Sequence, residues 1–107
     1  MRQMSVKELK VYLEQQAQLN PLLLDVREPW EYHMCRIENS TLIPMRQIPQ
    51  AVEELNPEQE TIVICHHGVR SRRVGQYLIQ SGFKNVINLE GGIDAWARQI
   101  DPQMTTY

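Results

Sequence analysis

Four short apolar segments, separated by segments with helical spacing, constrain the fold of this chain more than any other feature. The clearest is Thr61-Ile62-Val63-Ile64, and the others lie at 22–26, 41–43 and 85–89. Apolar runs of this length between turn signals are typical of strands buried on both faces. Because parallel strands need crossover connections, the alternation predicts an α/β fold with a mainly parallel sheet of about five strands, flanked by helices.

The segments between these strands carry helix start and stop signals. Ser5-Val6-Lys7-Glu8 is a capping-box pattern, and it predicts a helix over 5–19 that Asn20-Pro21 ends. Gly82 is placed to end a later helix. The remaining helices are predicted at 28–33, 49–55, 71–80 and 93–99.

The chain has 107 residues, which is the usual size of one domain. Its 42% hydrophobic and 22% charged residues are typical of a globular protein. A formal charge of -2 argues against bulk attraction to nucleic acid or to an anionic membrane. We therefore expect one domain over 1–107, with its core at about 5–99 and a short, weakly patterned tail at 100–107.

Neither a membrane span nor a secretory signal is recognisable in the sequence. The longest strictly apolar run, 62–65, is far shorter than the roughly 20 residues that span a bilayer. The first ten residues mix charged with apolar side chains and lack the apolar region of a signal peptide. These features predict a cytoplasmic protein.

Two cysteines, Cys35 and Cys65, are too few for a disulfide scaffold. Neither belongs to a C-x-x-C pair or to a Cys/His cluster with zinc-binding spacing, so their interest is as thiols. Cys65 follows the apolar strand at 61–64 and opens a loop that leads into a helix. Ligands bind at the carboxyl ends of strands in such sheets, so its position is that of a functional residue.

A loop that curls round a cysteine aims backbone N–H groups at the sulfur, and the following helix adds partial positive charge. Arg70, Arg72 and Arg73 stand at the start of that helix, where cations are unfavourable, and this conflict indicates an anion site. Such surroundings favour the thiolate, which makes Cys65 a candidate nucleophile. The alternative is that Cys65 is a small buried residue beside a solvated basic face. We prefer the reactive interpretation because strand end, Gly68, arginines and helix start coincide.

These segments resemble the single-domain rhodaneses, the thiosulfate and related sulfurtransferases. The similarity covers nearly the whole chain, and its elements follow the order of the family. The matching segments are Leu23-Leu24-Asp25-Val26-Arg27-Glu28, Glu31-Tyr32, Ile43-Pro44, Ile62-Val63-Ile64-Cys65 with Gly68 and Arg70-Ser71, and Gly91-Gly92-Ile93 with Trp96. The resemblance implies a rhodanese-like fold.

The resemblance also implies that Cys65 is catalytic. It would take a sulfane sulfur from thiosulfate or a persulfide donor, hold it as a persulfide, and pass it to cyanide, a thiol, a dithiol or a protein. Arg70 and the loop N–H groups would bind the anion without a metal or cofactor. The implied substrate-binding residues are His66, His67, Gly68, Val69, Arg70 and Ser71.

Two other functions remain open at this point. A rhodanese module without catalytic turnover would act as a sulfur carrier or as a partner-binding domain. A phosphatase or arsenate reductase would direct the same thiolate at a tetrahedral oxyanion. The loop from Cys65 to Arg70 has six residues, as in rhodaneses, whereas those enzymes carry one residue more. Loop length therefore favours sulfur transfer.

The sequence departs from the family pattern between the first two strands. Cys35-Arg36-Ile37 replaces the usual Gly-His-Ile, and Asn39-Ser40 replaces Gly-Ala. Cys35 is either a resolving thiol toward Cys65 or a passive buried thiol. We prefer the passive role and leave Cys35 outside the catalytic set.

Other side chains have both a functional and a structural interpretation. We expect the two histidines of the loop to lie at the lip of the pocket rather than to bind metal, since adjacent residues rarely share one ligand sphere. Asp25 and Arg27 are expected to be structural, with Arg27 pairing to Glu28 or Glu31. Trp30 and Trp96 are expected to pack in the protein rather than to bind substrate.

Overall fold

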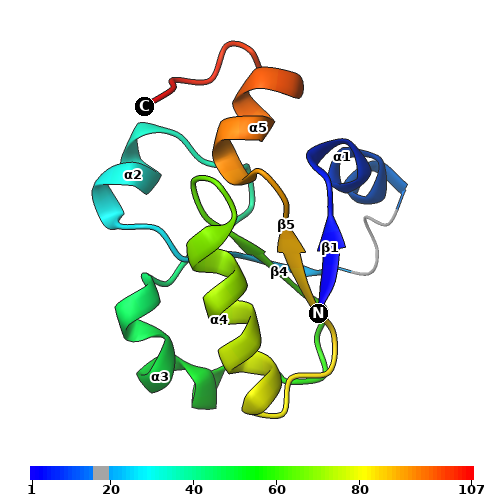
Figure 1. The fold of residues 1–107 in the computed structure, drawn as a ribbon, viewed down its shortest axis with the longest axis vertical. Helices are drawn as coiled ribbons and strands as arrows, with labels where there is room; N and C mark the ends of the chain where they lie inside the picture. Colours follow the sequence, from blue (N-terminus) through cyan, green and yellow to red (C-terminus); the bar gives the residue numbers. More distant parts are fainter. Residues whose placement is uncertain (16–19) are drawn as a thin grey trace.

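One parallel sheet of five strands, in the order β1-β5-β4-β2-β3, organises the protein (Figure 1). The computed structural model describes residues 1–15 and 20–107. Its strands are β1 (Arg2–Met4), β2 (Leu22–Asp25), β3 (Thr41–Leu42), β4 (Thr61–Ile64) and β5 (Val86–Leu89). The predicted α/β fold with a parallel sheet flanked by helices is confirmed.

The described residues also contain five α-helices and two 3-10 turns. The helices are α1 (Val6–Gln15), α2 (Pro29–Met34), α3 (Ile48–Ala51), α4 (Val69–Gln80) and α5 (Gly92–Gln99), and the turns η1 (Met45–Gln47) and η2 (Val52–Glu54) flank α3. The segment predicted as one helix over 49–55 is therefore divided.

The predicted signals at the ends of two helices are present in the structure. The Glu8 N–H donates to Ser5 Oγ at 3.1 Å and the Ser5 N–H donates to Glu8 Oε1 at 3.0 Å, which completes the capping box of α1. The last predicted residues of that helix, 16–19, lie outside the described residues. Gly82 follows α4 with a φ of +100°, so the predicted glycine stop is confirmed.

The strand β1 has no counterpart among the predicted strands. Its sequence, Arg-Gln-Met, contains one buried residue, Met4, and two exposed ones. Arg2 lies beside Ile87 and Met4 beside Leu89, so β1 forms one edge of the sheet by pairing with β5. Its position therefore depends on a distant partner rather than on an apolar pattern of its own.

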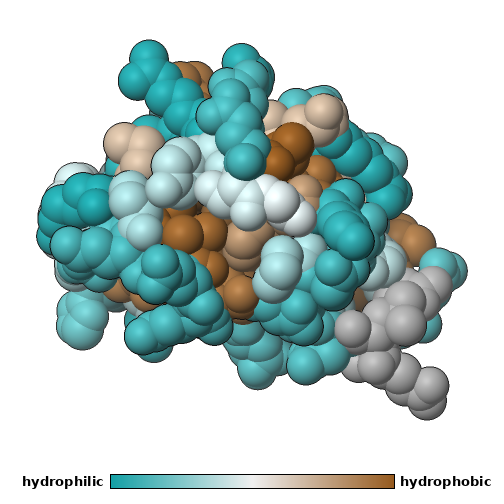
Figure 2. All heavy atoms as spheres, turned by 90° about the horizontal axis from the view of Figure 1, so that it is seen from below, coloured by the Kyte–Doolittle hydropathy of each residue, from teal (hydrophilic) through white to brown (hydrophobic). Residues whose placement is uncertain are grey.

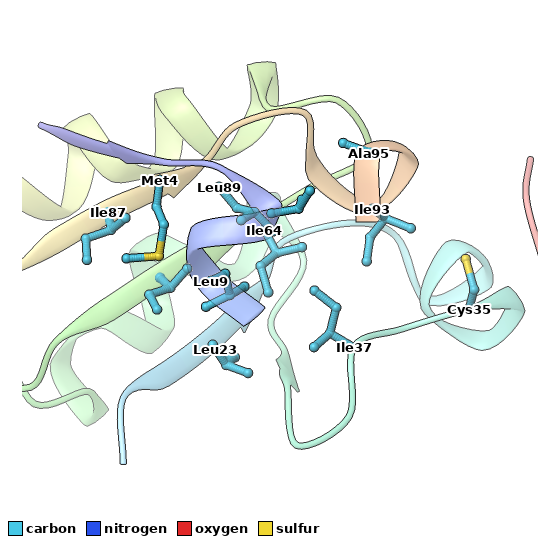
Figure 3. Close-up of a cluster of buried hydrophobic side chains, with 12 residues drawn as sticks. Met4, Leu9, Leu23, Cys35, Ile37, Ile64, Ile87, Leu89, Ile93 and Ala95 are labelled. Atoms are coloured by element: carbon cyan, nitrogen blue, oxygen red, sulfur yellow. The ribbon is translucent and has the colours of Figure 1, made fainter. Parts of the chain in front are cut away.

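Side chains alternate between the two faces of the sheet and form two buried clusters. In β4, Ile62 and Ile64 belong to the first cluster, and Val63 belongs to the second together with the adjacent Cys65. Figure 3 shows the first cluster, to which α1 contributes Leu9 and α5 contributes Ile93. The second cluster includes side chains of α3 and α4, which lie on the other side of the sheet (Figure 1).

The end of the molecule that carries α3 and the last turns of α4 is largely hydrophilic, with apolar residues visible in a central hollow (Figure 2). None of the described helices, in residues 1–15 and 20–107, is both long and apolar enough to cross a membrane. The carboxyl ends of β2 and β4 lie at the opposite end of the sheet, where the chain turns into α2 and α4. The candidate site is built at that end.

Candidate active site

The catalytic-loop candidate, residues 65–71, folds around the sulfur of Cys65. Cys65 directly follows β4 and is 1% exposed. The Gly68 N–H donates a hydrogen bond of 3.0 Å to Cys65 Sγ. Gly68 has a φ of +104°, a conformation that side chains disfavour, and this turn brings its N–H back over the sulfur. The predicted direction of loop N–H groups toward the sulfur is therefore present for Gly68.

The start of α5 holds the opposite side of this loop. The Ile93 N–H donates to the carbonyl oxygen of Cys65 at 2.9 Å, and the Asp94 N–H donates to that of His66 at 3.0 Å. A Cβ atom on Gly92 would lie 2.2 Å from the Cys65 oxygen, so only glycine permits this approach. Two loop carbonyls are thereby satisfied by α5.

A buried polar chain leads away from the sulfur toward the edge of the sheet. Cys65 Sγ donates to Ser71 Oγ at 3.3 Å, and the Ser71 hydroxyl in turn donates to Asn88 Oδ1. The Asn88 side-chain nitrogen donates to Gln3 Oε1 at 2.8 Å and to the Gly68 carbonyl at 3.4 Å. Ser71 and Asn88 are fully buried, so this chain fixes the environment of the thiol.

Arg70 links the loop to α2 through a two-pronged ion pair. Its Nη1 and Nη2 donate to the two carboxylate oxygens of Glu31 at 2.7 and 2.8 Å, and the Glu28 N–H also donates to that carboxylate. Burial alone would raise the pKa of Glu31, but these bonds and one from Tyr107 lower it to about 2. The charge of Arg70 is therefore neutralised by a group that sequence analysis did not place in the site.

A second ion pair, between Arg27 and Asp25, is completely buried. Arg27 donates to Asp25 through Nε at 2.9 Å and through Nη2 at 2.7 Å. Burial opposes the charge of Arg27, but the hydrogen bonds and charge of Asp25 outweigh this effect and raise the pKa of Arg27. The expected pairing of Arg27 with the carboxylate of Glu28 or Glu31 is wrong. Asp25, two residues earlier, points to the same side and holds the guanidinium.

Tyr107, from the weakly patterned tail, joins the two ion pairs. Its hydroxyl accepts a hydrogen bond from Arg27 Nη1 at 2.9 Å and donates one to Glu31 Oε2 at 2.8 Å. Burial raises the pKa of Tyr107 to about 12, supported by the bond to Glu31 and opposed by Arg27, so the hydroxyl stays protonated at neutral pH. Sequence analysis missed Tyr107, and its aromatic character in a polar tail is the only local signal.

The two histidines differ in their surroundings. The ring of His66 stacks on that of Tyr107 with centroids 4.1 Å apart. Burial, with repulsion from His67 and Arg70, lowers the pKa of His66. The exposed His67 has Nδ1 at 3.8 Å from an Asp94 oxygen. Residues 1–15 and 20–107 contain no group of three or more His, Cys, Asp or Glu side chains that could hold a metal ion.

The remaining candidates lie outside the loop. Cys35 is buried at one edge of the first core cluster beside α2 (Figure 3), with its sulfur 4.0 Å from Arg27 Nη1. Both cysteines are free thiols. Trp96 packs against that cluster as expected, whereas Trp30 is 59% exposed and its expected packing role is wrong. Trp30 belongs to the short helix α2, and its ring forms a T-shaped pair with that of Tyr107.

The fold and the site define a small α/β domain that holds one cysteine in a backbone loop at the end of a central strand. The Rhodanese-like domain family matches residues 5–99. The crystal structure of a rhodanese-like domain protein from Staphylococcus aureus has a TM-score of 0.82 and 35% identity, covering 90% of this chain and 91% of that one. The chain therefore belongs to the rhodanese-like domain family.

Two curated relatives match this chain over different shares of their own length. A protein named sulfurtransferase from Allochromatium vinosum is 39% identical over 77 residues, which are 72% of each chain. The rhodanese-like/PpiC domain-containing protein 12, chloroplastic, of Arabidopsis thaliana is 40% identical over 89 residues. That match covers 79% of this chain and 30% of the plant protein, so this chain spans only a part of it.

Proposed function

We propose that the protein transfers sulfane sulfur through a persulfide on Cys65, with thiosulfate or a persulfide as donor. The observation that carries this proposal is the Gly68 N–H, 3.0 Å from Cys65 Sγ, in a loop that leads into the first turn of α4. Both features stabilise negative charge on sulfur. The relative named sulfurtransferase supports the same chemistry.

The reaction consists of two displacements on sulfur. Cys65 first loses its proton to solvent, and its thiolate attacks the outer sulfur of thiosulfate. The donor S–S bond breaks, sulfite leaves with the electron pair, and Cys65 carries a persulfide. An acceptor thiolate or cyanide then attacks the outer persulfide sulfur, which breaks the new S–S bond and regenerates the Cys65 thiolate.

The loop supplies the binding groups for both steps. The N–H groups of residues 66–71 and the start of α4 provide fixed partial charges where the persulfide charge develops. Arg70 lies beside this position, although its charge is shared with Glu31. A thiol, a dithiol or a protein thiol is the proposed acceptor. Because the cycle needs a reduced cysteine, we place it in a reducing compartment such as the cytoplasm.

Intact-mass measurement after incubation with thiosulfate tests the proposal. The reduced wild-type protein and Cys35→Ser should each gain the mass of one sulfur atom and lose it on adding cyanide or dithiothreitol. Cys65→Ser should gain nothing. If the wild type gains no sulfur from thiosulfate or from a glutathione persulfide donor, the proposed function is wrong. Stable loading without turnover to any acceptor would instead indicate a sulfur-carrier module.

A further inference from the structure

The elements around the catalytic loop, residues 65–71, contact it in different ways. β4 leads directly into it, α4 continues from it, and the first turn of α5 binds two of its carbonyls. Among the described residues, α2 contacts the loop without any backbone–backbone hydrogen bond. On that side the closure consists of side chains, and one of them comes from outside α2, namely Tyr107.

Tyr107 is the second of four aromatic rings that lie in a row at this side of the loop. Its ring centroid lies 5.5 Å from that of Trp30 in α2 and 4.1 Å from that of His66 in the loop. The rings of Tyr107 and His66 are nearly parallel, with an interplanar angle of 12°. The His67 ring continues the row at 4.1 Å from His66. These rings span from α2 to the catalytic loop.

The hydroxyl end of Tyr107 is held by two charged groups. Arg27 donates to it and Glu31 accepts from it, and the side chains of both residues are buried. Hydrogen bonds to ionised groups are shorter and stronger than neutral ones. The ring therefore has a defined position between α2 and His66, rather than lying loosely over the site.

The backbone of the tail supports the same position. Ile100 and Asp101 donate to the carbonyl oxygen of Trp96 at 2.8 and 2.9 Å, and the Met104 N–H donates to Asp101 at 3.0 Å. Met104 and Tyr107 both pack against the first core cluster. The tail runs from α5 toward α2 and ends beside it (Figure 1). The tail, residues 100–107, is thus an ordered part of the candidate site.

The position of Tyr107 beside the loop affects how substrates can reach Cys65. Cys65 is almost completely buried, so every donor and acceptor must approach it past side chains at the rim. Removing the Tyr107 ring would leave His66 without its stacking partner and open the side between the loop and α2. We propose that Tyr107 is a specificity-determining residue that admits compact sulfur donors and acceptors to Cys65 and discriminates against bulky ones. This inference rests on the proposed sulfur transfer.

Kinetics with a compact and a bulky donor test the proposal. The donors are thiosulfate and an aryl thiosulfonate, with cyanide as the acceptor for both. In Tyr107→Ala we expect kcat/KM for the bulky donor to rise by about 10-fold relative to that for thiosulfate, the scale on which pocket shape discriminates. Tyr107→Phe keeps the ring and should keep the wild-type ratio. A ratio in Tyr107→Ala within about 2-fold of wild type would overturn the proposal.

A matched control separates local opening from a general loss of tyrosine packing. Tyr77→Ala removes a partly exposed tyrosine from the groove between α3 and α4 and should leave the ratio unchanged. Tyr107→Leu keeps an apolar side chain in place and serves if Tyr107→Ala does not fold. The same rise in the ratio is expected for Tyr107→Leu, and its absence in a folded protein counts against the proposal.

Alkylation of the thiol provides a readout that does not need sulfur transfer. In a Cys35→Ser background, the rates of Cys65 with iodoacetamide and with fluorescein maleimide report access for a small and a large reagent. The large-to-small rate ratio should rise about 10-fold in Tyr107→Ala. If the wild type accepts no sulfur yet this ratio rises, the proposed function fails while the closure by Tyr107 stands. If persulfide forms and neither ratio changes, the inference about Tyr107 alone fails.

Discussion

The backbone N–H of Ile93 donates a hydrogen bond of 2.9 Å to the carbonyl oxygen of Cys65. The first turn of α5 is thus part of the candidate site, although it follows Cys65 in the sequence by a helix and a strand. Gly92 permits this contact because its backbone lies against the loop carbonyls. The Gly91-Gly92-Ile93 segment therefore has a physical role in holding the cysteine loop.

We expect Gly92→Ala to disrupt the loop. Its Cβ would lie 2.2 Å from the Cys65 oxygen and 2.6 Å from the His66 oxygen, both backbone atoms, at a φ of +57°. Gly82→Ala is the control, since Gly82 also has positive φ, at +100°, but open space around the added Cβ. Urea unfolding should show a loss of about 1–2 kcal/mol for Gly82→Ala and a larger one for Gly92→Ala. Only Gly92→Ala should reduce sulfur transfer, and equal activity in both variants would contradict this role for α5.

The buried chain of hydrogen bonds from Cys65 through Ser71 to Asn88 predicts that removing the Ser71 hydroxyl lowers the free energy of unfolding. Ser71→Ala leaves Asn88 Oδ1 without its donor in a fully buried site, and we expect a loss of about 1–3 kcal/mol in unfolding free energy. Ser81→Ala removes an exposed hydroxyl that donates to a helix carbonyl and should cost less than about 0.5 kcal/mol. In a double-mutant cycle, Ser71→Ala and Asn88→Ala should be non-additive. Additive losses would show that the two side chains do not act as a unit.

The buried ion pair of Arg27 with Asp25 should contribute much more to stability than the exposed ion pair of Arg46 with Glu28. Arg27→Met leaves the Asp25 carboxylate buried without its cation, and we expect a loss of about 3–5 kcal/mol. Arg46→Met breaks the exposed pair between Arg46 and Glu28 and should cost no more than about 1 kcal/mol. Denaturant unfolding of both variants at neutral pH measures the difference. Similar losses would mean that burial does not govern the Arg27 pair.

The Glu31 carboxylate should make stability fall in acid. Its pKa is lowered from 4.5 to about 2 in the folded protein, so the unfolded chain binds this proton first as the pH falls. The stabilisation is complete above pH 4.5 and is lost progressively as the pH falls toward 2. It corresponds to about 3 kcal/mol. Glu31→Gln should be less stable than wild type at neutral pH, and its free energy of unfolding should depend less on pH below pH 4.5. If the curves of unfolding free energy against pH were parallel for the two proteins, Glu31 would not be the cause of the loss in acid.

Local signals explain which parts of the fold could be predicted. The apolar run of β4, the Ser5–Glu8 capping box and Gly82 each act over a few residues, and the structure contains all three. β1 was missed because an edge strand with one buried side chain has no pattern to detect. Its residues become a strand only through pairing with β5.

In the candidate site, too, local groupings could be predicted and contacts between distant residues could not. Cys65, Gly68 and Ser71 lie in one short segment, so their grouping could be predicted from the sequence. Arg70 meets Glu31 across 39 residues and Tyr107 meets Glu31 across 76. No local pattern links such positions, because the contacts form only after α2 and the tail pack on the loop. This is why sequence analysis assigned Arg70 to an anion and left Tyr107 unassigned.

The pairing of β1 with β5 also has a consequence for how the chain reaches its native state. Gln3 bonds to Asn88, 85 positions later, so the first strand must wait for the last before it can dock. Closing so long a loop costs entropy before any contact compensates it, and contacts of high sequence separation slow folding. During synthesis the first strand leaves the ribosome long before its partner exists. Because the hydrogen-bond chain from the thiol ends at Gln3, a nascent domain would acquire its complete cysteine environment only in the last stage of assembly.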